Sequence, residues 1–297
     1  MCGRIDLHTT PLRLAAIFRA RLGASIADTW QPSWNVAPSR EVIAITDLSS
    51  EAAKSPATAR SPTSTCPTTT HATTEAFALG HSQPGQHEPG RILVTFRWGL
   101  VPPWAADPAI GSRMINARAE TVATKASFRS AFSTRRCLIL ADGFYEWSSP
   151  SHAGARVAKT PFYFRRTDGS PLALAGLWES WVGSPRERAK GGRSDSRHPD
   201  GRPDSPVPHA ALRTCTIITT CANPDVAPVH HRMPVLIEQS DIDRWLLPSP
   251  LSRDTAESLL EPTARGVLTG YEVDPAVNDP AHDDESVVRP FLNTDHE

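Results

Sequence analysis

The second residue of the chain, Cys2, carries two groups that react with aldehydes once it becomes the first residue. An initiator methionine is commonly removed before a residue as small as cysteine, and loss of Met1 would leave a free α-amine beside the thiol. Such an amine titrates near ~7.7–8.0 and a thiol near ~8.5, so both have reactive fractions at neutral pH. Together they condense with an aldehyde, first to an imine and then, by thiol attack, to a thiazolidine. Cysteine is also a common small core residue, and Cys2 by itself favours that simpler role.

A carboxyl and an imidazole could supply the proton transfers that this condensation needs. Glu146 lies between Tyr145 and Trp147 in a strand-like segment, where partial desolvation would raise its pKa toward a useful value. His230 precedes His231 in a loop with proline at both ends, which can hold an imidazole rigidly. An outward-facing or ion-paired carboxylate is an equally good reading of Glu146 alone. No further ligands stand at metal-binding spacing, so no metal site is expected.

Polar, basic and aromatic residues of types suited to nucleic acid stand in two further segments. Asn116 and Arg118 offer an amide and a guanidinium two residues apart, although an N-cap and a surface arginine would explain them equally well. Arg97, Trp98 and Trp104 combine charge with aromatic rings, as single-stranded nucleic acid requires for phosphate contact and base stacking. A core strand that ends in a tryptophan-containing turn is the alternative.

The surrounding pattern predicts a mixed domain dominated by strands. Helical spacing with a proline start appears at 11–22, a short helix is expected at 116–122, and two more at 239–247 and 252–260. Strand-like runs follow one another with few helices between them, at 41–48, 92–99, 136–141, 144–147, 161–166, 171–178, 213–220 and 267–273. This order favours an α+β fold with a mainly antiparallel, partly closed sheet and peripheral helices.

Composition places the chain among globular proteins and against several other classes. Its 297 residues hold 31 Lys+Arg, 32 Asp+Glu and 39% hydrophobic residues. No stretch approaches the ~18 apolar residues of a membrane span, and the first residues do not have the pattern of a secretory signal. The five cysteines lack C-x-x-C spacing, which indicates a reducing, cytoplasmic setting rather than a disulfide framework.

Three segments differ from the rest in composition. Residues 51–90 are rich in Ser and Thr, and residues 183–206 contain no large apolar residue, so both are predicted to be disordered inserts in one domain spanning 1–297. Residues 272–297 are rich in Asp and Glu and are expected to form an acidic tail. The remaining body of the chain then carries net positive charge, which suits an anion-binding surface but also an unliganded one.

Taken together, the segments resemble the SRAP (SOS response-associated peptidase) family of abasic-site processing proteins. Each motif is short, but nine occur in the family's order and cover nearly all of the core. They are MCGR at Met1, WNVAPS at Trp34, RWGLVPPWA at Arg97, INARAETV at Ile115, FRSAFSTRRCLILADGFYEW at Phe128, PFYF at Pro161, LAGLWESW at Leu174, TCTIITTCAN at Thr214 and HHRMPVLI at His230.

The resemblance implies a single α+β domain with a barrel-like sheet, and covalent capture of ring-opened abasic sites in single-stranded DNA. Cys2 would be the nucleophile, and Asn116 would hold the opened sugar or position the Cys2 amine. Glu146 would be the general acid and base, and His230 would assist ring opening and imine chemistry. The resemblance further implies lyase-type crosslinking without a cofactor, with autocatalytic removal of Met1.

The same resemblance implies a set of DNA contacts. Phosphates would be held by Arg4, Arg97, Arg118 and Arg232, while Trp98 and Trp104 would flank the lesion. The expected partner is single-stranded DNA, bound by a monomer in the cytoplasm that associates with the nucleoid. Two alternatives stay open: a cysteine-dependent peptidase acting on other proteins, and a non-covalent sensor of single-stranded DNA that is indifferent to the aldehyde.

Overall fold

The computed structural model describes residues 2–23, 26, 30–47, 90–148, 159–183 and 211–291. Apart from their edge residues Gly90 and Gly183, the inserts expected at 51–90 and 183–206 lie outside the described residues, as does the end of the expected acidic tail. Among the described residues, no helix has the length and hydropathy needed to cross a bilayer.

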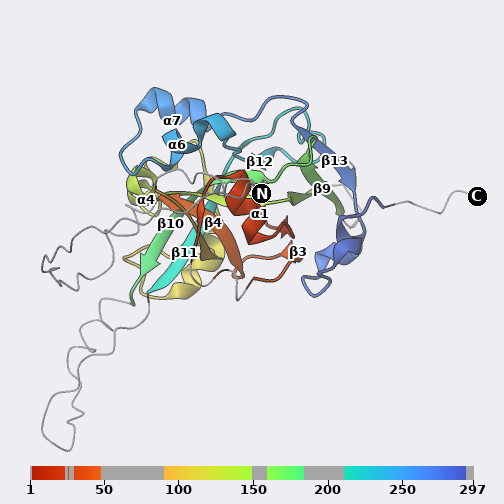
Figure 1. Cartoon of the computed structure of the whole chain (residues 1–297), viewed down its shortest axis with the longest axis horizontal. Helices are drawn as coiled ribbons and strands as arrows, with labels where there is room; N and C mark the ends of the chain where they lie inside the picture. The colour runs from red at the N-terminus through yellow and green to blue at the C-terminus, as the bar shows by residue number, and fades with distance from the viewer. Residues whose placement is uncertain are drawn as a thin grey trace, which may run out of the picture.

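Five strands close into a ring, and this ring is the centre of the fold (Figure 1). Around it, β4 pairs with β5 and β7, β10 pairs with β7 and β11, and a parallel β5–β11 pairing closes the circle. The other four pairings are antiparallel, which confirms the predicted mainly antiparallel, barrel-like α+β fold. The ring strands are β4 (Glu41–Asp47), β5 (Arg91–Trp98), β7 (Arg136–Ala141), β10 (Leu172–Trp181) and β11 (Leu212–Cys221).

Three short strands extend the ring. Strand β2 (Arg21–Leu22) pairs with β5, while β6 (Asn116–Arg118) and β12 (Arg232–Pro234) pair with β11. The helix expected at 116–122 is therefore wrong: residues 116–118 form β6 and residues 119–122 are turns. The residues on both sides of β6 also form backbone hydrogen bonds with β11, such as the bond from Ala119 N–H to the Thr219 carbonyl at 2.9 Å. The backbone polar groups of this segment are thus paired as in a strand. Tertiary pairing overrides local helix propensity here.

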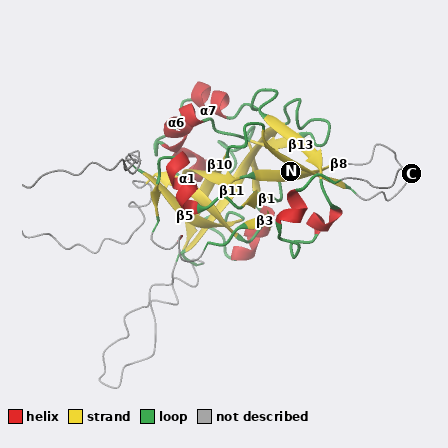
Figure 2. Ribbon diagram, turned by 45° about the vertical axis from the view of Figure 1, so that its right-hand side comes forward, coloured by secondary structure: helices red, strands yellow, loops and turns green. Residues whose placement is uncertain are grey.

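A second, five-stranded antiparallel sheet lies beside the ring (Figure 2). Its order is β13 (Leu268–Glu272), β9 (Thr160–Arg166), β8 (Gly143–Ser148), β1 (Ile5–Leu7) and β3 (Ser33–Val36). Strand β1 lies between β8 and β3, with Ile5 opposite Phe144 on one side and Val36 on the other. The chain terminus that carries Cys2 is thus anchored in the middle of a sheet.

Short helices cover the ring and the loops. Within the described part of the chain, the α-helices are α1 (Pro11–Ile17), α4 (Arg129–Thr134), α6 (Ile242–Leu246) and α7 (Arg253–Leu259), and the 3₁₀ helices are η1 (Pro108–Arg113), η2 (Gln239–Asp241), η3 (Pro275–Asn278) and η4 (Glu285–Val288). Helix α1 starts at the Thr10 cap, as its Pro11 start predicts, but ends before Arg19, whose φ of 49° turns the chain into β2.

Alternating side chains along the strands build three separate hydrophobic clusters. The site-side core holds Cys2 together with one face of the ring and of the second sheet; its members include Ile5, Trp98, Phe144, Ile217 and Met233. The helix-side core lies on the other face of the ring, under the helices; its members include Leu14, Leu93, Phe132, Ile218 and Trp245. The third cluster covers the outer face of the second sheet, and its buried members are Tyr145, Tyr163, Val273, Val277 and Val287.

The third cluster corrects the expectation of an acidic tail from residue 272 onward. Residues 272–291 fold against the second sheet, and Val273, Val277 and Val287 are fully buried there. Several acidic residues of this stretch serve as local caps: the Asp274 and Asp284 carboxylates accept backbone N–H bonds at the starts of η3 and η4. The apolar residues that pack against the second sheet are separated by acidic residues, so the overall composition of this stretch does not indicate that it is packed.

Candidate active site

Cys2 lies at the edge of the site-side core and is fully buried. The side-chain amide of Asn116 donates a hydrogen bond of 2.7 Å to its carbonyl oxygen. Burial raises the pKa of the Cys2 thiol, and the nearby Glu146 charge raises it further, while a hydrogen bond from the Arg4 backbone lowers it. The thiol therefore rests in its neutral form and needs a base close by to react.

Glu146 on β8 is a carboxyl close to Cys2. Strand alternation places its side chain on the same face as Phe144 of the site-side core, and it is 2% exposed. Burial raises the pKa of Glu146 to about 7, in the direction that its two aromatic neighbours predict. A carboxyl with this pKa exists in both protonation states near neutral pH, so it can donate and accept protons.

His230 reaches Glu146 from the loop before β12. Its Nδ1 atom lies 3.8 Å from Glu146 Oε2, 3.0 Å from the Arg232 backbone nitrogen and 3.1 Å from the Arg232 carbonyl oxygen. A neutral ring accepts the Arg232 N–H at Nδ1, whereas a protonated ring donates to the carbonyl and faces the carboxylate. Burial lowers the pKa of His230, so the neutral ring is favoured at pH 7.

Strand β6 supplies Asn116 and Arg118 to the same place. These two residues alternate with Ala117, which is buried in the helix-side core, so both point to the site side of the sheet. The Asn116 Oδ1 atom is buried and has no hydrogen-bond partner among the described residues. A buried acceptor without a partner is costly, and here it lies beside Cys2, ready for a donor on a ligand. Arg118 is exposed.

Trp98 does not fit the predicted role beside the lesion. It is 1% exposed, belongs to the site-side core, and its indole N–H donates to the Ile115 carbonyl at 2.9 Å. Arg97, the residue before it, is exposed but must point to the opposite face of β5 because strand residues alternate. Trp104 is 54% exposed on the turn after β5 and has the free ring surface that stacking requires.

Arg4 and Arg232, which were also predicted to contact phosphate, form hydrogen bonds within the protein. The Arg4 guanidinium donates to Asn35 Oδ1 and, at 2.8 Å, to the Val277 carbonyl on the outer face of the second sheet. The Arg232 guanidinium donates to both oxygens of Glu120 and to the Thr219 carbonyl. Of the four arginines predicted to bind phosphate, Arg118 alone is both exposed and on the site side.

The sequence argument did not assign Glu120, although it stands in the quoted INARAETV motif. Glu120 follows β6, and its ion pair with Arg232 joins the segment of Asn116 to the strand that follows His230. The bond to Arg232 lowers the pKa of Glu120 and keeps it ionised. The sequence offered one signal for this ion pair, an acidic residue in one motif and a basic residue in another. The two residues meet because β6 and β12 both pair with β11.

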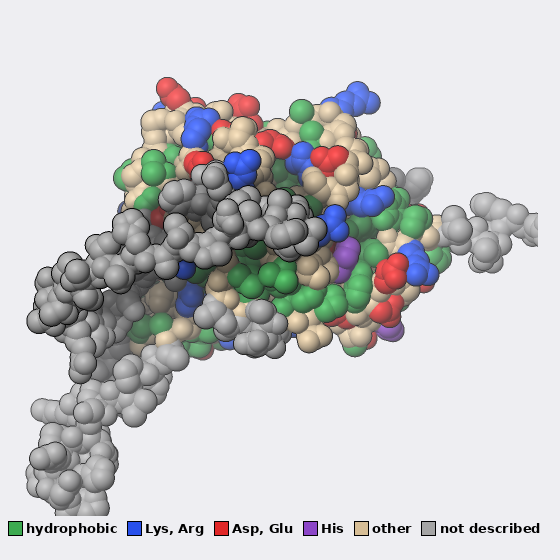
Figure 3. Space-filling model, viewed as in Figure 1, with side chains coloured by type: hydrophobic (Ala, Val, Ile, Leu, Met, Phe, Trp, Pro, Cys, Tyr) green, Lys and Arg blue, Asp and Glu red, His purple; other side chains and the backbone are tan. Residues whose placement is uncertain are grey.

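Among the described side chains that are visible in Figure 3, no large area of one charge sign appears. Basic and acidic side chains are interspersed there around a central hydrophobic area.

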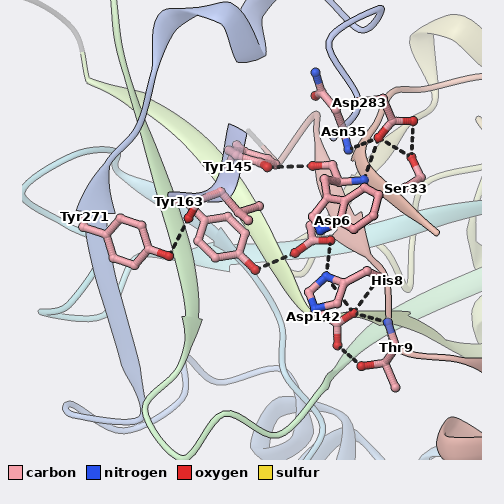
Figure 4. A network of polar contacts seen from close by, with 12 residues as sticks. Asp6, His8, Thr9, Ser33, Asn35, Asp142, Tyr145, Tyr163, Tyr271 and Asp283 are labelled. Carbon is pink, nitrogen blue, oxygen red and sulfur yellow. Dashed lines mark hydrogen bonds and ion pairs between the residues drawn. The ribbon is translucent and has the colours of Figure 1, made fainter. Parts of the chain in front are cut away.

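One group of potential metal ligands lies together within the described ranges: Asp6, His8 and Asp142 (Figure 4). Their oxygens are already used as hydrogen-bond acceptors. Asp6 accepts from Tyr163 at 2.7 Å and lies 2.9 Å from the His8 ring, while Asp142 accepts from the Thr9 hydroxyl and from two backbone amides. The group joins β1 to β9 and to the start of β8, and we assign it a structural role.

Comparison with known sequences gives consistent matches to one family. The profile of the SOS response associated peptidase (SRAP) family matches residues 1–280. The abasic site processing protein YoqW of Bacillus subtilis is 36% identical over 66% of this chain and 75% of its own length. YoaM of the same organism is 33% identical over 84% of this chain and 82% of its own, and chicken HMCES is 27% identical over 88% and 70%; both are also named abasic site processing proteins.

Solved structures share the fold. A crystal structure of a protein from Bacteroides thetaiotaomicron superposes with a TM-score of 0.67 and covers 98% of this chain and 100% of its own, at 21% identity. A protein from Bordetella bronchiseptica gives a TM-score of 0.58 over 92% of this chain and 100% of its own, also at 21% identity. The arrangement of ring and second sheet is therefore that of known structures.

Proposed function

Because the chain belongs to the SOS response associated peptidase family, we propose that it captures abasic sites in single-stranded DNA as a covalent adduct of Cys2. The observation that carries this proposal is the convergence of four groups on one place: the Cys2 terminus, the buried carboxyl of Glu146, the imidazole of His230 and the open amide oxygen of Asn116. The names of its relatives as abasic site processing proteins support the same substrate.

The chemistry requires that Met1 be removed, so that Cys2 presents an α-amine. The amine adds to the C1′ aldehyde of the ring-opened deoxyribose, and the resulting carbinolamine loses water to form an imine. The Cys2 thiol then adds to the imine carbon, its proton ends on the ring nitrogen, and a thiazolidine results. One water is released overall and no oxidant, metal or cofactor takes part.

Glu146 handles the protons of these steps. In its neutral form it donates a proton to the departing hydroxyl of the carbinolamine, and as a carboxylate it accepts the proton of the thiol. A pKa of about 7 makes both forms available at neutral pH. The neutral His230 ring favours sugar opening by accepting or relaying the hydroxyl proton, and its protonated form has the Glu146 carboxylate 3.8 Å away.

DNA would be held by few groups. Asn116 Oδ1 would accept a hydrogen bond from a hydroxyl of the opened sugar or from the Cys2 amine, and Arg118 would contact a phosphate on the same side of β6. Trp104 would stack on a base next to the lesion. In this proposal the protein acts as a monomer in the cytoplasm and is associated with the nucleoid when bound to DNA.

The direct test mixes the purified protein with a single-stranded oligonucleotide that carries one abasic site and separates the products on a denaturing gel. We expect a heat-stable adduct, whose mass equals protein without Met1 plus DNA minus one water. An oligonucleotide with tetrahydrofuran in place of the abasic sugar is the control, since it has no aldehyde.

Variants of Cys2 separate the alternatives. Cys2→Ala should abolish the adduct while binding to the tetrahydrofuran oligonucleotide is kept, and Cys2→Ser should give an imine that borohydride traps but no stable product. Adduct formation by Cys2→Ala, or by protein that retains Met1, would refute the mechanism. Binding without any adduct would favour the sensor, and turnover of peptides by mature protein would favour the peptidase.

A further inference from the structure

The segment of residues 275–283, which we name the C-terminal segment, contacts both strands that carry the reactive groups. Strand β1 continues from Cys2, and β8 carries Glu146. Two independent sets of bonds join the C-terminal segment to them: one through Asn35 and Arg4 to β1, and one through Trp147 to β8. Part of this segment, residues 281–283, lies beyond the residues that match the family profile.

Asn35 is the centre of the first set. It is fully buried on β3, and its side-chain amide donates to three carbonyl oxygens of the C-terminal segment, those of Val277 (3.2 Å), Asp279 (3.0 Å) and His282 (2.7 Å). Its Oδ1 atom accepts from the Arg4 guanidinium. A buried amide with every polar atom used fixes the position of all of its partners.

Asp283 closes the same contact from the other side (Figure 4). Its Oδ1 atom accepts the backbone N–H groups of Trp34 (2.6 Å) and Asn35 (2.8 Å), and its Oδ2 atom accepts the Ser33 hydroxyl at 2.8 Å. Charge-assisted bonds to backbone amides are stronger than neutral ones. They hold β3, and through Asn35 also Arg4, against the C-terminal segment.

Arg4 transmits this contact to Cys2. Its side chain is held on the outer face of the sheet by Asn35 and the Val277 carbonyl, while its backbone forms hydrogen bonds with Tyr145 and Cys2. The Arg4 carbonyl accepts a hydrogen bond from the N–H of Tyr145, the residue before Glu146, at 3.0 Å, and the Arg4 backbone N–H donates a hydrogen bond to the Cys2 thiol that lowers the pKa of this thiol. One residue therefore sets the place of the thiol relative to the strand of the carboxyl.

The second set of hydrogen bonds holds Trp147, the residue that follows Glu146 on β8. The Trp147 indole N–H donates to Asn278 Oδ1 at 2.7 Å, and the Tyr145 hydroxyl donates to the Trp34 carbonyl at 2.6 Å. Both residues that flank Glu146 are thus fixed on the outer face of the sheet. Because strand residues alternate, Glu146 then points to the site-side core, opposite to Tyr145 and Trp147.

We propose that the C-terminal segment is a positioning element for the reaction, which sets Cys2 against Glu146 through Arg4, Asn35, Asp283 and Asn278. In this role Arg4 holds the nucleophile and contacts no phosphate. The inference rests on the proposed covalent capture and names residues that govern its rate without touching the DNA. Misplacement of reacting groups by about 1 Å costs roughly 10²-fold in rate, so loss of these bonds should be visible in kinetics.

The test compares Asp283→Ala with Asp284→Ala, two neighbouring acids of which the second caps only η4. For each, the adduct rate constant at saturating abasic-site DNA is measured separately from the affinity for the tetrahydrofuran oligonucleotide. We expect Asp283→Ala to slow the reaction about tenfold or more with affinity and salt dependence unchanged, and Asp284→Ala to match the wild type. Asp283→Asn, which keeps an accepting oxygen, should recover most of the rate.

Hydrogen–deuterium exchange of the full chain provides a readout that does not depend on adduct formation. Asp283→Ala should raise exchange in peptides covering β1 and β8 relative to Asp284→Ala, at a temperature where circular dichroism shows all variants folded. A wild type that forms no adduct would overturn the proposed function, yet this exchange difference would still report the contact. Equal adduct rates for both variants, or a loss of DNA affinity that accounts for the slower reaction, would overturn the positioning role.

Discussion

The Nδ1 atom of His230 lies 3.8 Å from the Oε2 atom of Glu146, although the two residues are 84 positions apart in the sequence. Burial shifts the pKa values of the two groups in opposite directions, upward for Glu146 to about 7 and downward for His230. Near pH 7 both protonation states of Glu146 are therefore populated, while the neutral form of His230 is favoured beside it. This is the property that reversible imine chemistry asks of its acid and base.

Replacement of Glu146 by Gln should slow adduct formation and release by roughly 10²-fold, because the amide keeps the shape but cannot exchange a proton. The affinity for tetrahydrofuran-containing DNA should be unchanged or slightly higher, since a negative charge is lost. Time courses on denaturing gels, followed by release into excess competitor DNA, measure both directions. Wild-type rates in both directions would remove Glu146 from the mechanism.

Stability should also depend on pH through Glu146. Its pKa is about 7 in the folded protein against 4.5 as an isolated group, so the unfolded chain binds fewer protons between these values and stability falls as pH rises through them. Complete ionisation at pH 8 costs about 3 kcal/mol, and Glu146→Gln should recover most of it there but much less at pH 5. Urea unfolding of both proteins at the two pH values checks this, and an identical difference at pH 5 and pH 8 would contradict it.

Arg118 should account for one phosphate contact. Arg118→Ala should reduce the slope of log affinity against log salt concentration by ~0.7, the value for one phosphate on a single strand. Arg97→Ala is the matched control, because Arg97 is exposed but on the opposite face of β5. Equal effects of the two variants on the slope would mean that DNA follows a different path over the sheet.

The two tryptophans of the RWGLVPPWA motif should respond in opposite ways. Trp104→Ala should leave the melting temperature unchanged and weaken binding of single-stranded DNA by about 1–3 kcal/mol, the range for one stacked base. Trp98→Ala should destabilise the fold by about 3–5 kcal/mol, because a fully buried side chain is lost. Fluorescence anisotropy and thermal unfolding separate these effects, and intact DNA affinity in Trp104→Ala would exclude stacking.

The ion pair of Glu120 and Arg232 should affect the reaction more than the fold. Glu120→Ala should cost less than about 1 kcal/mol of stability, as partly exposed pairs do, but slow the adduct several-fold because Arg232 also binds His230 through its backbone. Glu257→Ala, which breaks an exposed pair on α7, is the control. Should both variants keep the wild-type rate, the pair has no part in holding His230.

The sequence by itself determined the class of fold and supplied the residue types of the proposed reaction. Cys2 at the second position, Glu146 between two aromatic residues and His230 in a proline-bounded loop are local features, and their chemistry follows from side-chain type. Strand alternation and turn residues were likewise enough for a mainly antiparallel sheet. The inference about the fold class is confirmed because strand alternation depends on near neighbours along the chain, and the roles of the three reactive residues belong to the proposed mechanism.

Only the tertiary structure decided which way the other side chains face. Asn116–Arg118 is a strand because β11 offers it an edge, and Trp98 is buried while Trp104 is exposed because β5 ends between them. Arg4 is hydrogen-bonded to Asn35, 31 residues later, and the Trp34 backbone is hydrogen-bonded to Asp283, 249 residues later. The charge and hydropathy of a single residue do not predict such partners, because the position of the partner is fixed by how the sheets close and not by the local sequence.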